Sequence, residues 1–446
     1  MNTTYSSLFA QKSGTAGLSS LIELKNKFLV TILVLFVYRF GTYVPLPGVN
    51  PQALTKFSSQ GFSGFLGMLN VFSGGALGRM TIFALNVMPY IVASIVMQLL
   101  LAAFSGIEAL KKEGSAGRDK INLYTRYATI VFCLLHGSLI ASNVESMHAK
   151  NGLDLVFSGI LLKVMVVLTL TAGTFLLLWL GDIITSNGIG NGVSLIVFTS
   201  IVSELPNSFA SIFYLNKVGT ISGFVLLFIL LFVCAVVFLI VFVEKSYRHV
   251  PVQYPKRQVG RKLFDRDFSH IPLKINTAGV IPAIFASTLL LMPMTVVNFI
   301  NNDDIANLIV FYLSPGKLLY LVLYSLLIVF FCFFYTSIVF NADELADSLK
   351  KNGGIILGKR PGKNTATYLN YIVSRLTVLG SAYVVFVCIV AEVIRSVYAI
   401  PFAMGGTSLL IAVGVVIDII SQVQTHLFSY RYGSLVKKAG VRSRAG

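Results

Sequence analysis

The chain has 446 residues, of which 55% are hydrophobic and only 12% are charged, and its formal net charge is +17. Soluble globular proteins carry about 25% charged residues, and the mean hydropathy here is +0.80, so the composition excludes an ordinary soluble domain. Many apolar stretches approach the ~20 residues that cross a bilayer, while the alternating ~10-residue segments of a β-barrel are missing. The sequence therefore predicts an all-α polytopic membrane protein.

Ten membrane-spanning helices are expected from the apolar stretches. Their ranges are 26–44, 76–104, 122–142, 155–179, 191–204, 221–243, 275–297, 318–340, 369–391 and 407–427. We expect the first helix to be retained, because polar residues precede it and Pro45 and Pro47 follow it in place of a small-residue signal-peptidase site.

The basic residues give the expected orientation. Most of the 35 lysines and arginines fall in the termini and in every second loop, and such loops stay in the cytoplasm. Both termini are therefore predicted to be cytoplasmic. The expected organisation is a tail (1–25), a first half (26–204), an external linker (205–220), a second half (221–427) with two cytoplasmic loops (245–274 and 341–368), and a C-terminal tail (428–446).

The two long basic loops exceed what orientation requires. In the first, the sequence VPVQY predicts a short hairpin. In the second, an acidic helical part is followed by Gly358, Pro361 and Gly362, which favour a tight turn that presents Lys359 and Arg360 outward. The basic face either reflects topology alone or attracts anionic lipid, ribosomal RNA or an acidic partner protein.

A short internal repeat indicates how the halves are related. MPYIVAS (88–94) and IPAIFAS (281–287) match at Pro, Ile, Ala and Ser. Five predicted helices precede residue 205 and five follow, so the copies have opposite orientations, as in an inverted repeat. Inverted repeats also occur in secondary transporters, which is the alternative function, but the expected spans lack the convergent charged residues of such a site.

Two glycine-rich segments allow more than one interpretation. Residues 61–71 are too short to span the membrane and too apolar for a plain loop. They form either a surface half-helix or a re-entrant stopper inside a cavity. TSNGIGNGVSL (185–195) lacks the lysine of a phosphate-binding P-loop, so its glycines more plausibly let a helix approach its neighbours closely.

Few polar residues fall inside the predicted helices. Arg39 and Lys163 are expected to reach the membrane interface with their long side chains, and His136 and Asp418 to be structural. The four cysteines lack CxxC spacing and are expected to be small buried hydrophobes. Without a nucleotide motif, a Ser/His/Asp set or clustered metal ligands, the sequence predicts no enzyme and no cofactor; an intramembrane hydrolase lacks its nucleophile and base.

Longer motifs carry a resemblance to a known family. They are PLPGVN (45–50), FSGGALGRMTIFAL (72–85), MPYIVASIVMQLL (88–100), WLGDIITSNGIGNGVS (179–194), VPVQYPKRQVGRK (250–262), KINTAGVIPAIFAS (274–287) and KKNGGIILGKRPG (350–362). With these, nearly the whole chain resembles the SecY family of bacterial protein-translocation channels. The resemblance implies a clamshell of two inverted five-helix halves around a central pore in the bacterial inner membrane. It also implies a passive channel for unfolded secretory polypeptides that releases transmembrane helices sideways into lipid.

The resemblance further implies a ring of aliphatic side chains at the waist of the pore. The matching positions are Val87, Ile91, Val193, Val197, Ile284 and Ile411. Two pairs among them are spaced i, i+4, so each lies on one helix face. A hydrophobic constriction can bar ions by dewetting and still deform around a passing polypeptide.

Three further groups of residues are implied by the resemblance. The plug includes Phe62, Phe65, Leu66, Met68 and Leu69; the lateral gate includes Ser94, Gln98, Asn276 and Ser287; docking of a motor or ribosome involves Arg257, Arg261, Lys262, Lys359 and Arg360. Gln98 and Asn276 could form a hydrogen bond that breaks on opening. The implied partners are the small subunits SecE and SecG, the motor ATPase SecA, the ribosome, signal sequences, nascent polypeptides and membrane lipid.

Overall fold

The structure is a computed structural model whose described residues form two compact units. The described residues are 24–48, 70, 72–104, 113–151, 159–219, 222–254, 258–259, 262–263, 268–297, 311–314, 316–398 and 405–443. The first unit comprises the residues up to Ser94, Ile121–Glu204 and the residues from Val415 onward, and the second unit comprises Ile95–Lys120 and Leu205–Gly414. The units thus do not follow the predicted halves throughout, because Ile95–Lys120 groups with most of the second half and the residues from Val415 onward group with most of the first half.

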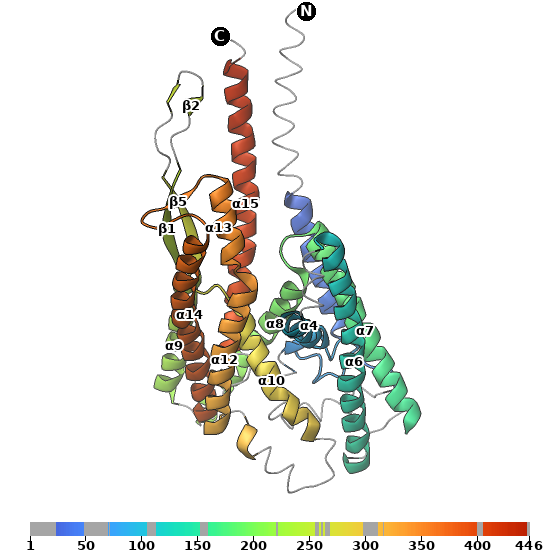
Figure 1. Cartoon of the computed structure of the whole chain (residues 1–446). Helices are drawn as coiled ribbons and strands as arrows, with labels where there is room; N and C mark the ends of the chain where they lie inside the picture. Colours follow the sequence, from blue (N-terminus) through green and yellow to red (C-terminus); the bar gives the residue numbers. More distant parts are fainter. Residues whose placement is uncertain are drawn as a thin grey trace, which may run out of the picture. The chain divides into compact units, whose positions relative to one another are not determined.

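Helices dominate both units (Figure 1). The first described helix covers residues 24–41. The others are α4 (Met88–Ala103), α6 (Ser115–Asn151), α7 (Ile160–Asn187), α8 (Gly192–Lys217), α9 (Gly223–Glu244), α10 (Ile281–Val297), α12 (Leu318–Val339), α13 (Ala342–Lys351), α14 (Lys363–Tyr398) and α15 (Gly406–Ser443).

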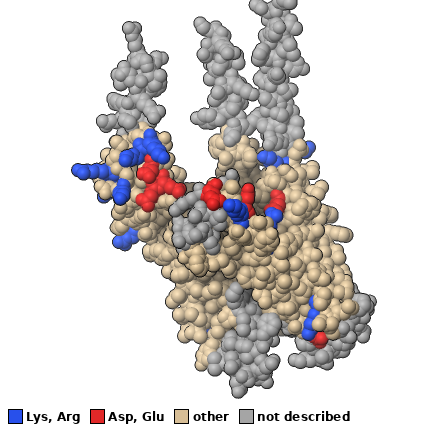
Figure 2. Space-filling view, turned by 45° about the vertical axis from the view of Figure 1, so that its right-hand side comes forward, with Lys and Arg blue, Asp and Glu red and all other residues tan. Residues whose placement is uncertain are grey.

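The apolar helices have the lengths and surfaces of membrane spans. Within the described ranges, seven helices are long and apolar enough to cross a bilayer. The shorter apolar helices Met88–Leu101 and Ile281–Leu290 and the helix over 24–41 correspond to the other predicted spans. Phe224 of α9 is 80% exposed and Phe238 is 72% exposed, and broad areas of the face in Figure 2 carry no charged side chain. Such a surface is suited to contact with lipid.

The predicted helix over 76–104 is wrong in its first part, because residues 73–87 form a series of turns and α4 begins only at Met88. Gly74, Gly75, Met80 and Asn86 have positive φ angles, which a right-handed helix cannot contain. The segment is buried, and the carbonyl oxygen of Ile82 lies 2.1 Å from where a Cβ on Gly173 would be. Close packing on α7 therefore overrides the apolar helical pattern.

Other element boundaries also differ from the prediction, and α6, α14 and α15 are longer than their predicted spans. Helix α8 continues through Pro206 to Lys217, so most of the predicted linker 205–220 is helical. Helix α7 extends to Asn187, whereas α10 starts at Ile281, after bends and turns over 275–280. The two repeat motifs nevertheless start their helices at corresponding residues, Met88 and Ile281, each with proline in the first turn, where its missing N–H costs nothing.

The first long loop forms the predicted hairpin. Strand β1 (Tyr247–Gln253) pairs antiparallel with β4 (Phe268–Lys274), with Val250 opposite Ile271. Strands β2 (Gln258–Val259) and β3 (Lys262–Leu263) pair in a second, two-stranded sheet.

The second long loop joins the same sheet, which the sequence did not indicate. Its strand β5 (Ile355–Ile356) pairs with the other edge of β1, giving the order β4-β1-β5 (Figure 1). The predicted acidic helical part is α13, whose buried Ala346 and Leu349 share a core with Val250, Val252 and residues of α14. The two loops therefore fold as one body.

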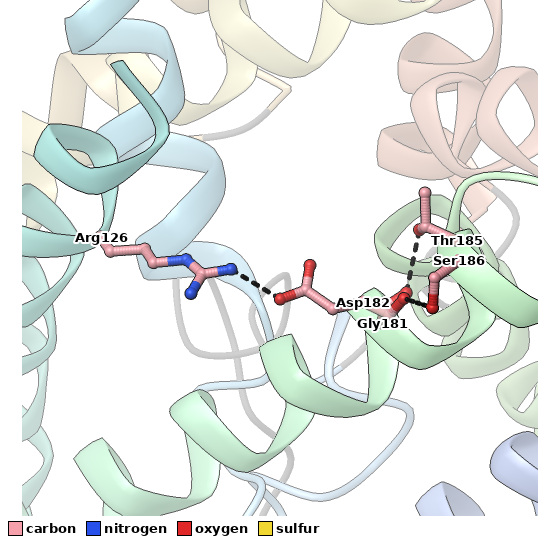
Figure 3. A network of polar contacts seen from close by, with 5 residues as sticks. All are labelled: Arg126, Gly181, Asp182, Thr185 and Ser186. Atoms are coloured by element: carbon pink, nitrogen blue, oxygen red, sulfur yellow. Dashed lines mark hydrogen bonds and ion pairs between the residues drawn. The ribbon is translucent and has the colours of Figure 1, made fainter. Parts of the chain in front are cut away.

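Two ion pairs join α6 and α7. Arg126 of α6 binds Asp182 of α7 at 2.7 Å (Figure 3), and Glu145 of α6 binds Lys163 of α7 at 2.5 Å. The charge of Lys163, which was expected to reach the interface, is matched by a carboxylate on the neighbouring helix. The Arg126–Asp182 side chains are more than half exposed, so this pair is worth at most about 1 kcal/mol.

Candidate functional site

Four of the six predicted ring positions lie in the first unit. Val87 ends the turn segment 73–87 and is fully buried, and Ile91, in the first turn of α4, is half-buried. Val193 lies in the first turn of α8, where it is half-buried, and Val197 follows one turn later, with 5% of its surface exposed. Val193 and Val197 therefore share one face of α8, whereas the predicted helix face of Val87 and Ile91 is wrong, because Val87 lies in the turn before α4.

Glycines bring the start of α8 against α7, as the sequence suggested. A Cβ on Gly192 would lie 2.0 Å from the carbonyl oxygen of Gly181, so only glycine fits there. The backbone N–H of Gly192 donates to Thr185 Oγ1 at 2.9 Å, and Gly190 has φ +90°, the left-handed region that glycine adopts without strain. This close approach places Val193 beside α7, where a Cβ added to Gly181 would lie 3.4 Å from Val193 Cγ2.

The other two ring positions belong to the second unit. Ile284 lies in the first turn of α10 and is half-buried, and its carbonyl oxygen accepts from Ser287 Oγ at 2.9 Å and from Thr288 Oγ1 at 2.7 Å. Ile411 of α15 is 4% exposed. A common ring of all six side chains stays a prediction.

The predicted gate residues have defined surroundings. Ser94 and Gln98 are half-buried on α4, and Ser287 is buried on α10. Asn276 lies before α10 and not within it. Its Nδ2 donates to Glu244 Oε1 at 2.6 Å and to the carbonyl oxygen of Gly279 at 3.0 Å.

Sequence reasoning missed Glu244 as a partner of Asn276. The available signal was a carboxylate that ends the very apolar helix α9. Because a charged acceptor strengthens a hydrogen bond, this contact anchors the chain where it enters α10.

The predicted docking tip is exposed. Lys359 and Arg360 lie between β5 and α14, flanked by Gly358 with φ +77° and Gly362 with φ +102°. Lys359 Nζ lies 5.3 Å from the ring centroid of Tyr368. In the part of the chain that the structure describes, neither basic side chain forms an ion pair, so the turn presents uncompensated positive charge.

The side chains of the remaining predicted site residues lie outside the description. Lys262 lies in β3, but its side chain is outside the description. The five plug residues, Phe62, Phe65, Leu66, Met68 and Leu69, lie outside the described residues, as do Arg257 and Arg261.

His136 and the cysteines have local surroundings in the described helices. His136 Nδ1 contacts the carbonyl oxygen of Phe132, one turn earlier in its own helix, at 3.0 Å. Cys133, Cys332 and Cys388 are buried as expected, while Cys234 is exposed. No group of three or more His, Cys, Asp or Glu that could hold a metal ion occurs within the described ranges.

Fold and site together define a polytopic helical membrane protein with a small sheet domain built from two of its loops. The family model described as SecY matches residues 81–420. The protein translocase subunit SecY of Rickettsia bellii is 47% identical over 422 residues, covering 94% of this chain and 98% of that protein. The subunit of the same name from Escherichia coli is 44% identical, with 94% and 95% covered. The chain belongs to the SecY family.

Solved structures share the fold. A structure described as that of a protein conducting channel has a TM-score of 0.66 at 20% identity and covers 91% of this chain and 93% of its own. Sec61 in a canine ribosome-channel complex from the endoplasmic reticulum gives a TM-score of 0.63 at 19% identity, with the same shares covered.

Proposed function

We propose that this chain is the channel subunit of a bacterial protein translocase, a passive pore through which unfolded secretory polypeptides cross the membrane. The observation that carries the proposal is membership of the SecY family over nearly the full chain, with relatives named as protein translocase subunits. The chain would also release transmembrane helices sideways into lipid. A bound motor ATPase or ribosome would supply the driving force.

The pore would be sealed by the six aliphatic positions. Val87, Ile91, Val193, Val197, Ile284 and Ile411 offer no hydrogen bonds to a polypeptide, and a narrow ring of such side chains dewets and excludes ions. The burial of Val87 and Val197 within the first unit supports a tightly packed seal. Residues 61–71 would close the pore from the outer side.

The lateral gate would lie between α4 and α10, which begin at corresponding residues of the repeat. Signal sequences would pass between Ser94 and Gln98 on one helix and Ser287 on the other. Asn276 and Glu244 would hold the chain at the entrance of α10.

The β4-β1-β5 sheet and the turn with Lys359 and Arg360 would face the cytoplasm and bind the motor ATPase SecA or ribosomal RNA. Uncompensated positive charge on an exposed, glycine-flanked turn supports this assignment, because such charge attracts acidic protein surfaces and phosphates. SecE and SecG would complete the complex in the bacterial inner membrane, with both termini of this chain in the cytoplasm.

Crosslinking to a stalled secretory chain tests the pore. In a variant whose four native cysteines are replaced by alanine, Ile91→Cys and Ile284→Cys should crosslink to the stalled polypeptide. Leu231→Cys, on the exposed face of α9, should not. Equal labelling at all three positions would contradict the assignment of the ring.

Charge reversal tests the docking turn. Arg360→Glu should impair SecA-dependent export while the variant still inserts into the membrane. Lys217→Glu is the matched control, because Lys217 is an exposed base at the end of α8 on the predicted outer side. Unchanged export by Arg360→Glu would remove this residue from the docking site.

A further inference from the structure

Three polar side chains from distant parts of the sequence meet inside the first unit. Tyr38 Oη and Ser200 Oγ lie 2.6 Å apart, and Asn86 Nδ2 donates to the same Ser200 Oγ at 2.9 Å. All three residues are at most 1% exposed. A buried cluster of this kind links the helix over 24–41, the turn segment 73–87 and α8.

Ser200 is saturated by these contacts. Its own hydroxyl donates to the carbonyl oxygen of Ile196 at 2.8 Å. A serine hydroxyl has one proton and two acceptor lone pairs, so Tyr38 is assigned as the donor of the other short contact. Removing this one oxygen would leave donors on both Tyr38 and Asn86 buried without their acceptor.

Asn86 also sets the direction of the chain. Its φ angle is +50°, in the left-handed region that asparagine tolerates better than most side chains. Its Nδ2 makes a second, short hydrogen bond to the carbonyl oxygen of Phe72, which ties the two ends of the turn segment together. The next residue is Val87, and α4 begins directly after it.

The same contact connects two predicted ring residues. Val87 directly follows Asn86 in the sequence. Val197 precedes Ser200 by three residues, so Val197 and Ser200 are neighbours on one face of α8. The Asn86–Ser200 hydrogen bond thus ties the residue directly before Val87 to a residue one turn after Val197.

We propose that Asn86 is a positioning residue of the pore, which holds Val87 against α8 through its hydrogen bond to Ser200 and so keeps the idle channel closed to ions. This inference rests on the proposed function, and specifically on the ring. Asn86 Oδ1 has no hydrogen-bond partner among the described residues, so the amide is held through its nitrogen alone.

The test is the chloride leak of the idle translocase, purified as the whole complex and reconstituted in liposomes. Asn86→Gly keeps a backbone that tolerates the positive φ and removes only the amide. Ser200→Ala removes the acceptor. Each should raise the leak about fivefold, the population change that corresponds to a net hydrogen bond of about 1 kcal/mol. The double variant should leak less than the product of the two single increases, because both changes break the Asn86–Ser200 contact, while only Asn86→Gly also loses the bond to Phe72.

Two controls separate positioning from a general loss of stability. Tyr38→Phe takes a similar hydrogen bond from Ser200 without touching the Asn86 contact, so its leak should stay at the wild-type level even though its unfolding temperature falls. Ser211→Ala removes an exposed serine hydroxyl of the same helix, which among the described residues bonds to the carbonyl oxygen of Asn207. It should change neither quantity.

Ile91→Gly separates failure of the positioning role of Asn86 from failure of the proposed ring, because it removes a ring side chain directly. If Ile91→Gly leaks while Asn86→Gly and Ser200→Ala stay tight, the positioning role is overturned and the ring stands. A leak in Tyr38→Phe equal to that of Asn86→Gly would also overturn it. If Ile91→Gly itself stays tight, the ring fails and the positioning role with it.

Discussion

The two copies of the repeat motif start their helices at corresponding residues, but the chain enters the two helices along different paths. Before α4, the chain runs through a buried turn segment that touches α7 and is hydrogen-bonded to α8. Before α10, it leaves strand β4 through bends over 275–280, held by Asn276 and by a backbone bond from Ile275 to Ser246. The motif therefore fixes where a helix starts, while tertiary contacts fix the path of the chain into it.

The largest effect is expected where the turn segment meets α7. A methyl group on Gly173 would approach the carbonyl oxygen of Ile82 to 2.1 Å, and backbone on both sides leaves no room to relax. Gly173→Ala should cost about 3 kcal/mol or more and sharply lower the yield of folded protein, measured by size-exclusion chromatography and thermal unfolding. Gly137→Ala, whose new methyl would meet Val167 at an ordinary 3.5 Å, should be neutral. Equal yields would show that the segment is looser than described.

Removal of the anchor before α10 comes next. Asn276 is buried and donates to a carboxylate, and hydrogen bonds to charged groups contribute about 1.5–3 kcal/mol. Asn276→Ala should destabilise the protein by about 2 kcal/mol in thermal or denaturant unfolding. Thr277→Ala, one residue later, removes a half-buried hydroxyl whose described hydrogen bond goes to the nearby carbonyl oxygen of Lys274, and it should change stability by less than about 0.5 kcal/mol. Equal losses in both variants would contradict the role of Glu244.

A smaller loss is expected for Tyr38→Phe, which removes the hydroxyl that bonds to Ser200. The packing of its ring against Phe83, at a centroid distance of 6.0 Å, remains. The variant should lose about 1 kcal/mol of unfolding free energy. A loss comparable to that of Gly173→Ala would mean that the polar cluster, and not steric fit, dominates this region.

The smallest effect is expected for Arg126→Ala, which breaks the exposed ion pair with Asp182. Its cost should lie below about 1 kcal/mol and should shrink further as salt screens the charges. Unfolding curves at low and high ionic strength measure both. A salt-independent loss of several kcal/mol would show that this pair is less accessible to solvent than its described exposure.

The sequence supported the helical class, most spans, the hairpin and the exposed turn, since each depends on local composition or on turn residues such as Gly358 and Gly362. It did not reveal the turn segment 73–87. That segment is as apolar as a helix, and its conformation depends on contacts such as Asn86 with Ser200, which are 114 residues apart in the sequence.

Other contacts that the sequence did not reveal have the same cause. Arg39 Nη1 donates to the carbonyl oxygen of Gly74 at 3.3 Å and to Ser203 Oγ at 3.0 Å. No local sequence pattern predicts such hydrogen-bond partners. The partnership of Asn276 with Glu244 and the pairing of β5 with β1 likewise join residues that are remote in the sequence.

The pairing of β5 with β1 couples the exposed turn mechanically to the sheet. A force applied at Lys359 or Arg360 is transmitted through the two residues of β5 to strand β1. Strand β1 follows α9 after a few residues, and its partner β4 is followed by the segment that leads into α10. A molecule bound at this turn would therefore transmit force through the paired strands to the segment that leads into α10.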